Sequence, residues 1–239
     1  MKEPTISLVI PAYNEEKYIG KCLEHTIKNS QGKFYEIIVV DNASTDRTFS
    51  IASSYPQVKV IKEERKGQVR ARQRGYVESK GDILAWIDAD TEMPSGWVDK
   101  IIEEFKKDKD LGCLSGPYYY YDISRWNRFL FSVWTMFTVV AYNIVGYLIT
   151  GGNFAIKKEV LEKMGGFDTD IEFYGEDTNI ARRAHEFGKV KFMLNFSMST
   201  SGRRFKNEGI FKTGYTYFIN FLSEILYHRP ATKEYKDYR

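Results

Sequence analysis

The stretch DILAWIDAD, residues 82–90, ends in two aspartates that are separated by a single alanine. The five residues before the first aspartate, 83–87, are all apolar, and such a run is typical of a buried β-strand. A buried carboxylate is costly, and two carboxylates close together repel each other. We therefore expect a positive charge to meet Asp88 and Asp90 at the carboxyl end of this strand.

Strand and helix patterns alternate on the amino-terminal side of this stretch. Apolar strands are predicted at residues 6–13, 35–41 and 58–62, and helices at residues 15–30, 44–55 and 67–81. Ser44 or Thr45 is expected to cap the second of these helices. Such alternation is typical of an α/β fold, in which a mostly parallel sheet carries helices on both faces.

Polar residues follow three of the predicted strands at the point where each strand ends. They are Tyr13-Asn14-Glu15, Asp41-Asn42 and Asp88-Ala89-Asp90. In open sheets of this kind, ligands bind beyond the carboxyl ends of the strands, so we expect a binding site at this edge. Neither G-x-G-x-x-G nor G-x-x-x-x-G-K-[ST] follows any strand, which argues against a Gly-rich dinucleotide site and against a P-loop.

The spacing of Asp88 and Asp90 suits a divalent cation. Mg²⁺ and Mn²⁺ prefer hard oxygen ligands, and often take one or two carboxylates together with phosphate oxygens of a substrate. Ala89 between them keeps the turn small and lets the backbone approach. The alternative is a strand-end turn with solvated acids, and these three residues alone leave both interpretations open.

Five motifs occur in order along the chain: VIPAYNEEKYIGKCL, IIVVDNASTDRT, KGQVRARQRG, WIDADT and GEDTNIARR. Together they resemble family 2 glycosyltransferases over residues 5–190. The resemblance implies a GT-A fold, with a Rossmann-like, mostly parallel sheet flanked by helices. It also implies transfer of a sugar from a nucleotide diphosphate donor with inversion at the anomeric carbon.

The resemblance implies a role for each matching position in the nucleotide site. The nucleoside pocket would be lined by Pro11, Ala12, Tyr13 and Glu15. Asp41 would accept a hydrogen bond from the base, commonly uracil, and Arg72 would reach toward the base or the phosphates. The chain has Arg65 and Gln73 where the family often has Asn, which leaves the identity of the donor open.

The resemblance also implies where the metal and the catalytic base lie. Asp90 would ligate Mn²⁺ or Mg²⁺ on the donor pyrophosphate, and Asp88 would contact the ribose or the metal. Asp177 would be the catalytic base. Chemistry supports that role, because a carboxylate within hydrogen-bond reach can take the proton of an acceptor hydroxyl. Asp177 also opens a predicted helix at 179–187, whose dipole favours a negative charge there, although an ordinary acidic helix start would look the same.

Two further segments are candidates for donor contacts. Paired glycines in Thr150-Gly151-Gly152-Asn153 let a backbone approach a ligand closely, so Gly152 and Asn153 are expected to line the donor-sugar pocket. Arg203 and Arg204 are expected to bind the leaving diphosphate, because a guanidinium fork can bind two oxygens. The respective alternatives are a plain turn and a solvated basic turn.

Length and composition limit the organisation of the chain. Its 239 residues suit one large domain with an elaboration. We expect a glycosyltransferase domain at 1–200, with a nucleotide-binding half (1–90) and an acceptor half (91–200), followed by an aromatic, basic helical tail at 201–239. The net charge of +3 is too small to indicate a nucleic-acid partner. Cys22 and Cys113 form no C-x-x-C pair, and the amino terminus lacks a signal-peptide pattern, so a cytoplasmic protein is expected.

The run at residues 129–149 carries no charge and is long enough to span a bilayer. However, Ser132, Thr135, Thr138 and Tyr142 place a polar stripe on one helical face, which indicates an amphipathic helix at the membrane interface instead. The basic, aromatic segment 211–230 is expected to lie beside it and to meet anionic lipid. The alternative is that both segments pack on the sheet.

The sequence thus predicts an inverting, metal-dependent glycosyltransferase that uses a UDP sugar and acts on a lipid-linked or glycan acceptor at the inner face of a membrane. Two alternatives remain: a soluble acceptor, and a non-catalytic, membrane-associated module that binds a nucleotide sugar. A sugar-nucleotide pyrophosphorylase is disfavoured, because it would carry a Gly-rich loop soon after the first strand, and PAYNEEKYIG does not supply one.

Overall fold

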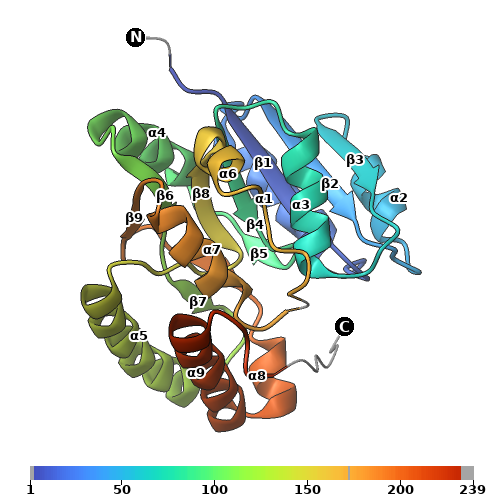
Figure 1. Ribbon diagram of the computed structural model, residues 1–239. Coiled ribbons are helices and arrows are strands. Elements are labelled where there is room, and N and C mark those ends of the chain that lie inside the picture. Colours follow the sequence, from blue (N-terminus) through green and yellow to red (C-terminus); the bar gives the residue numbers. More distant parts are fainter. Residues whose placement is uncertain (1–2, 172, 233–239) are drawn as a thin grey trace.

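The computed structural model describes residues 3–171 and 173–232 (Figure 1). A seven-stranded sheet has the order β3-β2-β1-β4-β8-β6-β9. Its strands are β1 (Ile6–Ala12), β2 (Glu36–Asp41), β3 (Val58–Lys62), β4 (Ile83–Ile87), β6 (Leu111–Ser115), β8 (Asn153–Lys157) and β9 (Lys189–Phe192). All neighbours pair in parallel except β8, which is antiparallel to both β4 and β6. The predicted mostly parallel α/β sheet is therefore confirmed.

Helices cover both faces of this sheet, and a separate apolar cluster lies on each face. One cluster includes side chains of α1 (Ile19–Ser30), α2 (Thr48–Ser53) and α4 (Trp97–Lys107). The other includes side chains of α3 (Gln68–Glu78), α6 (Lys158–Lys163) and α7 (Glu176–His185). All five residues of β4 are buried, because helices press on it from both sides. The strand that ends in Asp88 thus lies at the centre of the core.

The prediction that Ser44 or Thr45 caps the second helix is wrong. Helix α2 begins only at Thr48, whose backbone N–H donates to the Asp46 carboxylate at 2.9 Å. Ser44 instead accepts a hydrogen bond from the backbone N–H of Asn14, and the backbone N–H of Thr45 donates to the Asn14 side chain at 2.8 Å. These two residues join the loops that follow β1 and β2, so they shape the edge of the sheet where the site was expected.

A second, three-stranded sheet extends this edge, in the order β5 (Thr91–Glu92), β10 (Met198–Thr200) and β7 (Tyr118–Tyr120). Three helices lie beyond it: α5 (Arg125–Val145), α8 (Arg203–Glu208) and α9 (Ile210–Tyr227). Figure 1 shows them together at the end of the molecule opposite the amino terminus. In the described residues, no helix is long and apolar enough to cross a bilayer.

The predicted polar stripe of α5 faces the protein. The hydroxyl of Tyr142 donates to the backbone carbonyl of Val190 in β9, and Thr135 and Thr138 are half-buried. The side chain of Ser132 lies outside the described part of the chain. The helix is therefore amphipathic, as predicted, with its polar side turned inward.

Candidate active site

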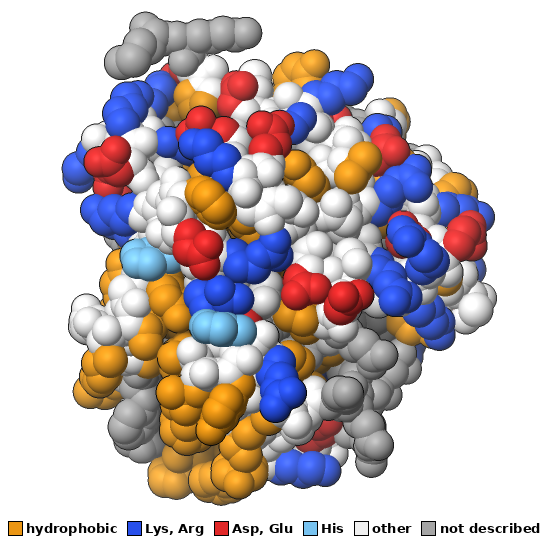
Figure 2. Space-filling view, viewed as in Figure 1, with side chains coloured by type: hydrophobic (Ala, Val, Ile, Leu, Met, Phe, Trp, Pro, Cys, Tyr) orange, Lys and Arg blue, Asp and Glu red, His pale blue; other side chains and the backbone are white. Residues whose placement is uncertain are grey.

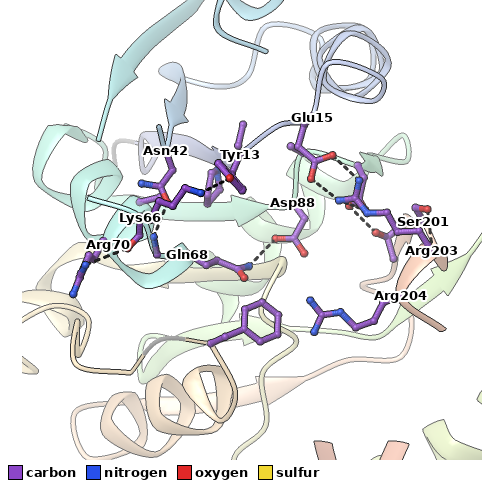
Figure 3. Close-up of a pocket in the computed structure, with 18 of the residues that line it drawn as sticks. Tyr13, Glu15, Asn42, Lys66, Gln68, Arg70, Asp88, Ser201, Arg203 and Arg204 are labelled. Carbon is purple, nitrogen blue, oxygen red and sulfur yellow. Dashed lines mark hydrogen bonds and ion pairs between the residues drawn. The ribbon is translucent and has the colours of Figure 1, made fainter. Parts of the chain in front are cut away.

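A cleft of about 470 Å³ opens at the carboxyl ends of β1, β2 and β4. Nine of the residues singled out in the sequence line it: Pro11, Ala12, Tyr13, Glu15, Asp88, Ala89, Asp90, Arg203 and Arg204. Figure 3 shows the labelled side chains converging on the cleft from both sides. Residues from the two ends of the chain therefore form one site, and part of the predicted carboxy-terminal tail belongs to it.

The positive charge that meets Asp90 is Arg203. Its guanidinium lies 3.2 Å from the Asp90 carboxylate. Each of its two terminal nitrogens also donates a hydrogen bond to the Glu15 carboxylate, one of them at 2.8 Å (Figure 3). Asp90 also accepts a hydrogen bond from the Thr200 hydroxyl at 3.1 Å. Burial raises the pKa of Asp90 to about 7, and Glu15 and Asp88 add to this effect while Arg203 opposes it. This side of the cleft therefore holds a surplus of negative charge.

Asp88 is held by a residue that the sequence analysis did not single out. The hydroxyl of Tyr118 in β7 donates to the Asp88 carboxylate at 2.8 Å. Gly152 lies directly against this pair, since a Cβ atom there would stand 2.0 Å from the Tyr118 hydroxyl and 2.2 Å from the Asp88 carboxyl carbon. Gly152 thus allows a close approach, but the groups that approach it belong to the protein and not to a ligand.

Asn153 lies away from the cleft, contrary to the expectation that it lines the donor-sugar pocket. Its side chain is fully buried and accepts a hydrogen bond from the indole N–H of Trp97 at 2.9 Å. Its amide donates to the backbone carbonyls of Gly116 and Phe196 at 3.0 and 2.7 Å. Because both ends of the side chain are occupied, Asn153 joins β8 to the neighbouring loops.

Arg72 also differs from the expectation, because it does not reach the cleft. Its side chain is fully buried, forms an ion pair with Glu176, and lies 3.6 Å from the Asp88 carboxylate. A buried guanidinium requires such partners, since an unpaired charge inside a protein is very costly. Arg72 therefore lies beneath the site and connects the end of β4 to the start of α7.

Asp177 lies in the first turn of α7, which begins after Gly175 at φ 81°. Burial raises the pKa of Asp177, while Arg72 and the backbone N–H of Gly151 act in the opposite direction. Burial likewise raises the pKa of Glu176 to about 7 against the pull of Arg72. The two neighbouring acids at this helix start are therefore better proton acceptors than ordinary surface carboxylates.

The segment that runs from the loop before α3 into its first turn supplies three further cleft residues, Lys66, Gln68 and Arg70. The ammonium of Lys66 donates to the Tyr13 hydroxyl and lies 4.3 Å from the centre of its ring. The loop is held in place by Asn42, whose side chain bonds the backbone of Glu63 and Gly67. All three residues belong to the motif KGQVRARQRG, but the sequence did not show which of the cations in this motif face the cleft.

Asp41 is buried at the end of β2. One of its carboxylate oxygens, Oδ1, is buried and has no hydrogen-bond partner among the described residues. Such an acceptor is normally satisfied, so an N–H group of a ligand is a natural partner for it. Asp41 is not among the residues that line the cleft, although its neighbour Asn42 is.

The acid pair can be tested as a metal site by its chemistry. Among residues 3–171 and 173–232, no group of three or more His, Cys, Asp or Glu side chains is arranged to hold a metal ion by itself. Asp88 and Asp90 nevertheless face a cleft with surplus negative charge. Mg²⁺ is often bound by one or two carboxylates together with substrate phosphates. This arrangement therefore fits a metal that takes some of its ligands from Asp88 and Asp90 and others from a bound diphosphate.

A sequence model of Glycosyl transferase family 2 matches residues 7–165. The chain belongs to this family. It is 25% identical over 234 residues to glycosyltransferase GlyG of Streptococcus pneumoniae serotype 4, an alignment that covers 93% of this chain and 69% of GlyG. It is 38% identical over 111 residues to the dolichol-phosphate mannosyltransferase of Pyrococcus furiosus, covering 44% of this chain but only 31% of that enzyme.

Among solved structures, the chain resembles a mannosyltransferase from Pyrobaculum calidifontis in complex with GDP-Man and Mn²⁺. The TM-score is 0.71 at 20% identity, and the alignment covers 95% of this chain and 65% of that one. This likeness shows a GT-A fold. Together with the family, it identifies the protein as a glycosyltransferase of family 2.

Proposed function

We propose that the protein is an inverting, metal-dependent glycosyltransferase that moves a sugar from a nucleoside diphosphate donor, first of all a UDP sugar, to a lipid-linked or glycan acceptor. One observation carries the proposal. A buried Arg72 joins Asp88, at the donor end of the cleft, to Glu176 beside Asp177 at the start of α7. The acids proposed for metal binding and for catalysis are thus connected through one buried side chain.

The donor base would lie against Pro11, Ala12 and Tyr13 and use the buried Oδ1 atom of Asp41 as its acceptor. The N3–H group of uracil suits this oxygen. Guanine also offers N–H donors on one edge, and the similar mannosyltransferase is bound to GDP-Man, so a GDP sugar is the second candidate. In either case the Oδ1 atom of Asp41 would distinguish bases by where they place an N–H group.

Asp90 and Asp88 would hold Mn²⁺ or Mg²⁺, which would supply positive charge to the departing diphosphate. Arg203 forms an ion pair with Asp90 at 3.2 Å. A diphosphate would offer the Arg203 and Arg204 guanidinium groups oxygens with the geometry that they bind well. Arg203 could then keep its bonds to Glu15 while Asp90 becomes available.

Asp177 would take the proton from the acceptor hydroxyl as that oxygen attacks the anomeric carbon. The bond between the sugar and the diphosphate breaks on the opposite face, and the diphosphate leaves with the electron pair. Burial raises the pKa of Asp177, which makes its carboxylate a stronger base for this step. In this scheme residues 1–90 bind the nucleotide and residues 91–200 face the acceptor, at the cytoplasmic surface of a membrane.

A panel of UDP and GDP sugars tests the proposal. Donor binding is measured by thermal shift with Mn²⁺, with Mg²⁺ and with a chelator, and release of UDP or GDP is measured with polyprenyl phosphate, short glycans and water-soluble acceptors. We expect metal-dependent binding and acceptor-dependent release. Binding without release under every condition would favour the non-catalytic alternative, and release with water-soluble acceptors alone would favour a soluble acceptor. The absence of any donor binding would overturn the proposal.

A further inference from the structure

Helix α9 has its apolar side turned outward. Its buried side chains are all polar: Thr213, Asn220 and Glu224. Apart from Lys212, the exposed ones are large and mostly apolar: Phe211, Tyr215, Phe218, Leu222, Leu226 and Tyr227. They recur at helical spacing along one stripe, and Phe211 is 82% exposed. An amphipathic helix on a water-soluble protein normally has the reverse arrangement, so this stripe needs an apolar environment.

Polar contacts to α7 fix this orientation. Glu224 is fully buried, accepts a hydrogen bond from the Asn179 amide at 2.9 Å, and lies 3.5 Å from the guanidinium of Arg182. Asn220 bonds both the hydroxyl and the backbone N–H of Thr232. Rotation of α9 to hide its apolar stripe would remove these partners from a buried carboxylate, which is strongly unfavourable. The outward apolar stripe is therefore a built-in property of the fold.

Helix α5 adds to the same surface. It exposes Trp126, Met136, Val140 and Ile144, while Phe131 packs on Phe205 of α8 with ring centres 4.5 Å apart. Figure 2 shows the orange side chains gathered over α5 and α9 at one end of the molecule, in contrast to the mixed charges elsewhere on this face. Apolar patches of this extent mark interaction sites on soluble proteins.

Charge indicates which partner covers the patch. Lys212 and Arg229 are exposed beside it, and Lys206, also exposed, pairs with Asp122 at 3.0 Å, whereas Glu224, the single acidic residue of α9, is buried. An apolar face with basic neighbours is complementary to a bilayer that contains anionic lipid. A second copy of the same face would bring like charges together, so charge disfavours self-association.

The patch is also continuous with the cleft. Tyr217 of α9 lines the cleft, where its hydroxyl accepts a hydrogen bond from Arg204 at 3.3 Å, while its helix neighbours Tyr215 and Phe218 are exposed. We propose that the outer faces of α5 and α9 dock on an anionic bilayer and hold the mouth of the cleft at the level of the lipid headgroups. The choice of a bilayer as the partner rests on the proposed lipid-linked acceptor. The outer faces of α5 and α9 are the surface of the protein that would meet this bilayer.

Flotation with vesicles tests this surface without donor, metal or acceptor. The parent protein is compared on vesicles of phosphatidylcholine alone and of equal parts of phosphatidylcholine and phosphatidylglycerol. The test variant carries Phe211→Gln, Phe218→Gln and Leu222→Gln. The matched control carries Tyr35→Gln, Val77→Gln and Leu194→Gln, at exposed apolar positions outside the patch. Circular dichroism and thermal unfolding show whether each variant is folded.

We expect the parent and the control to float with the anionic vesicles, and the partition coefficient of the test variant to fall by about a hundredfold, because binding strength scales with buried apolar area. A Lys212→Gln, Arg229→Gln variant should lose roughly twentyfold on anionic vesicles, and much less on neutral ones.

Two results would overturn the docking surface. The first is a parent that does not float, including one that forms a dimer which the triple variant dissolves. The second is a test variant that floats as well as the control. Because flotation needs no chemistry, loss of docking with intact sugar transfer to a soluble acceptor would leave the proposed transferase standing. Docking of the parent without sugar transfer to any acceptor would leave the docking surface standing and would contradict the proposed transferase.

Discussion

Asp90 and Glu224 are carboxylates that each lie beside an arginine, but Asp90 is half-buried at a cleft whereas Glu224 is fully buried. Asp90 shares Arg203 with Glu15 and has Asp88 nearby. Burial raises the pKa of Asp90 to about 7, and the two neighbouring acids add to this effect while Arg203 opposes it. Glu224 lies between α7 and α9, where it accepts a hydrogen bond from the Asn179 amide and lies 3.5 Å from Arg182, which also pairs with Glu186. The first group opens on a cleft, and the second is closed.

This difference distinguishes a site that awaits a ligand from a contact that completes a fold. Surplus negative charge is unfavourable until a cation arrives, so the Asp90 group should gain from metal and lose little when an acid is removed. In the Glu224 group, removing the acid should leave Asn179 without this hydrogen-bond acceptor and leave Arg182 with Glu186, 3.4 Å away, as its remaining acidic partner. The predictions below test whether binding and stability separate in this way.

The largest expected effect is on donor binding by Asp90→Ala. Loss of an outer partner of a metal ligand typically costs 10–100-fold in affinity, so loss of a ligand itself should cost about a hundredfold or more. The change is measured as donor affinity in Mn²⁺, by calorimetry. Asp110→Ala, at an exposed acid, is the control and should bind as the parent does. If Asp90→Ala binds donor in Mn²⁺ as tightly as the parent, Asp90 is not the ligand.

Asp177→Asn comes next, because it removes the proposed base but keeps the size of the side chain. Sugar transfer should fall by roughly a hundredfold or more, with donor affinity unchanged. Single-turnover release of the nucleoside diphosphate measures the effect, with Asp170→Asn at an exposed position as the control. Unchanged turnover would remove Asp177 from the mechanism, and would favour an acceptor that is already ionised, such as a lipid phosphate.

Much of the sheet edge could be predicted from the sequence. Apolar strands that end in polar residues place Tyr13, Asp41 and Asp88 on one edge of a parallel sheet, because those strands all point the same way. Nine of the proposed site residues do line the cleft. Arg72 and Asn153 could not be placed in advance, since spacing gives the element that carries a side chain but not the partner that it finds.

The helical end shows the same limit more clearly. The polar stripe on α5 predicts an amphipathic helix, but periodicity does not show which side faces the protein. The side of α9 that faces the protein depends on the contacts of Glu224 with Asn179 and Arg182. Asn179 lies 45 residues earlier in the chain, so no local pattern reveals this contact. Tyr118 was missed for a similar reason, because its contact with Asp88 depends on the small sheet of β5, β10 and β7.

Glu224→Gln is expected to act on stability rather than on metal. The glutamine can still accept a hydrogen bond from Asn179, but Arg182 loses the buried one of its two opposite charges and keeps Glu186, so the free energy of unfolding should fall by about 1–3 kcal/mol. Urea unfolding measures this change, and Glu103→Gln, at an exposed helical position, is the control. Donor affinity in Mn²⁺ should be unchanged. A stable Glu224→Gln protein that has lost metal-dependent binding would reverse the comparison with Asp90.

The smallest expected effect is the part of the pH dependence of stability that is due to Asp90. An aspartate in an unfolded chain has a pKa of about 3.9, and burial raises the pKa of Asp90 to about 7. Between these pH values the folded protein keeps a proton that the unfolded chain has released. The contribution of Asp90 to stability is therefore fully present below about pH 4, and is lost as the pH rises through about 7.

Asp90→Asn cannot ionise, so it should remove this loss. Without metal, the variant should be more stable than the parent by on the order of 1 kcal/mol at about pH 8, and the difference should shrink toward about pH 4. Glu176, whose pKa is also raised to about 7, titrates in both proteins and cancels in the comparison. Added Mn²⁺ should stabilise the parent and not the variant. A stability difference that does not change between these two pH values would show that Arg203 already balances the charge of Asp90, and that the cleft holds no surplus for a metal to relieve.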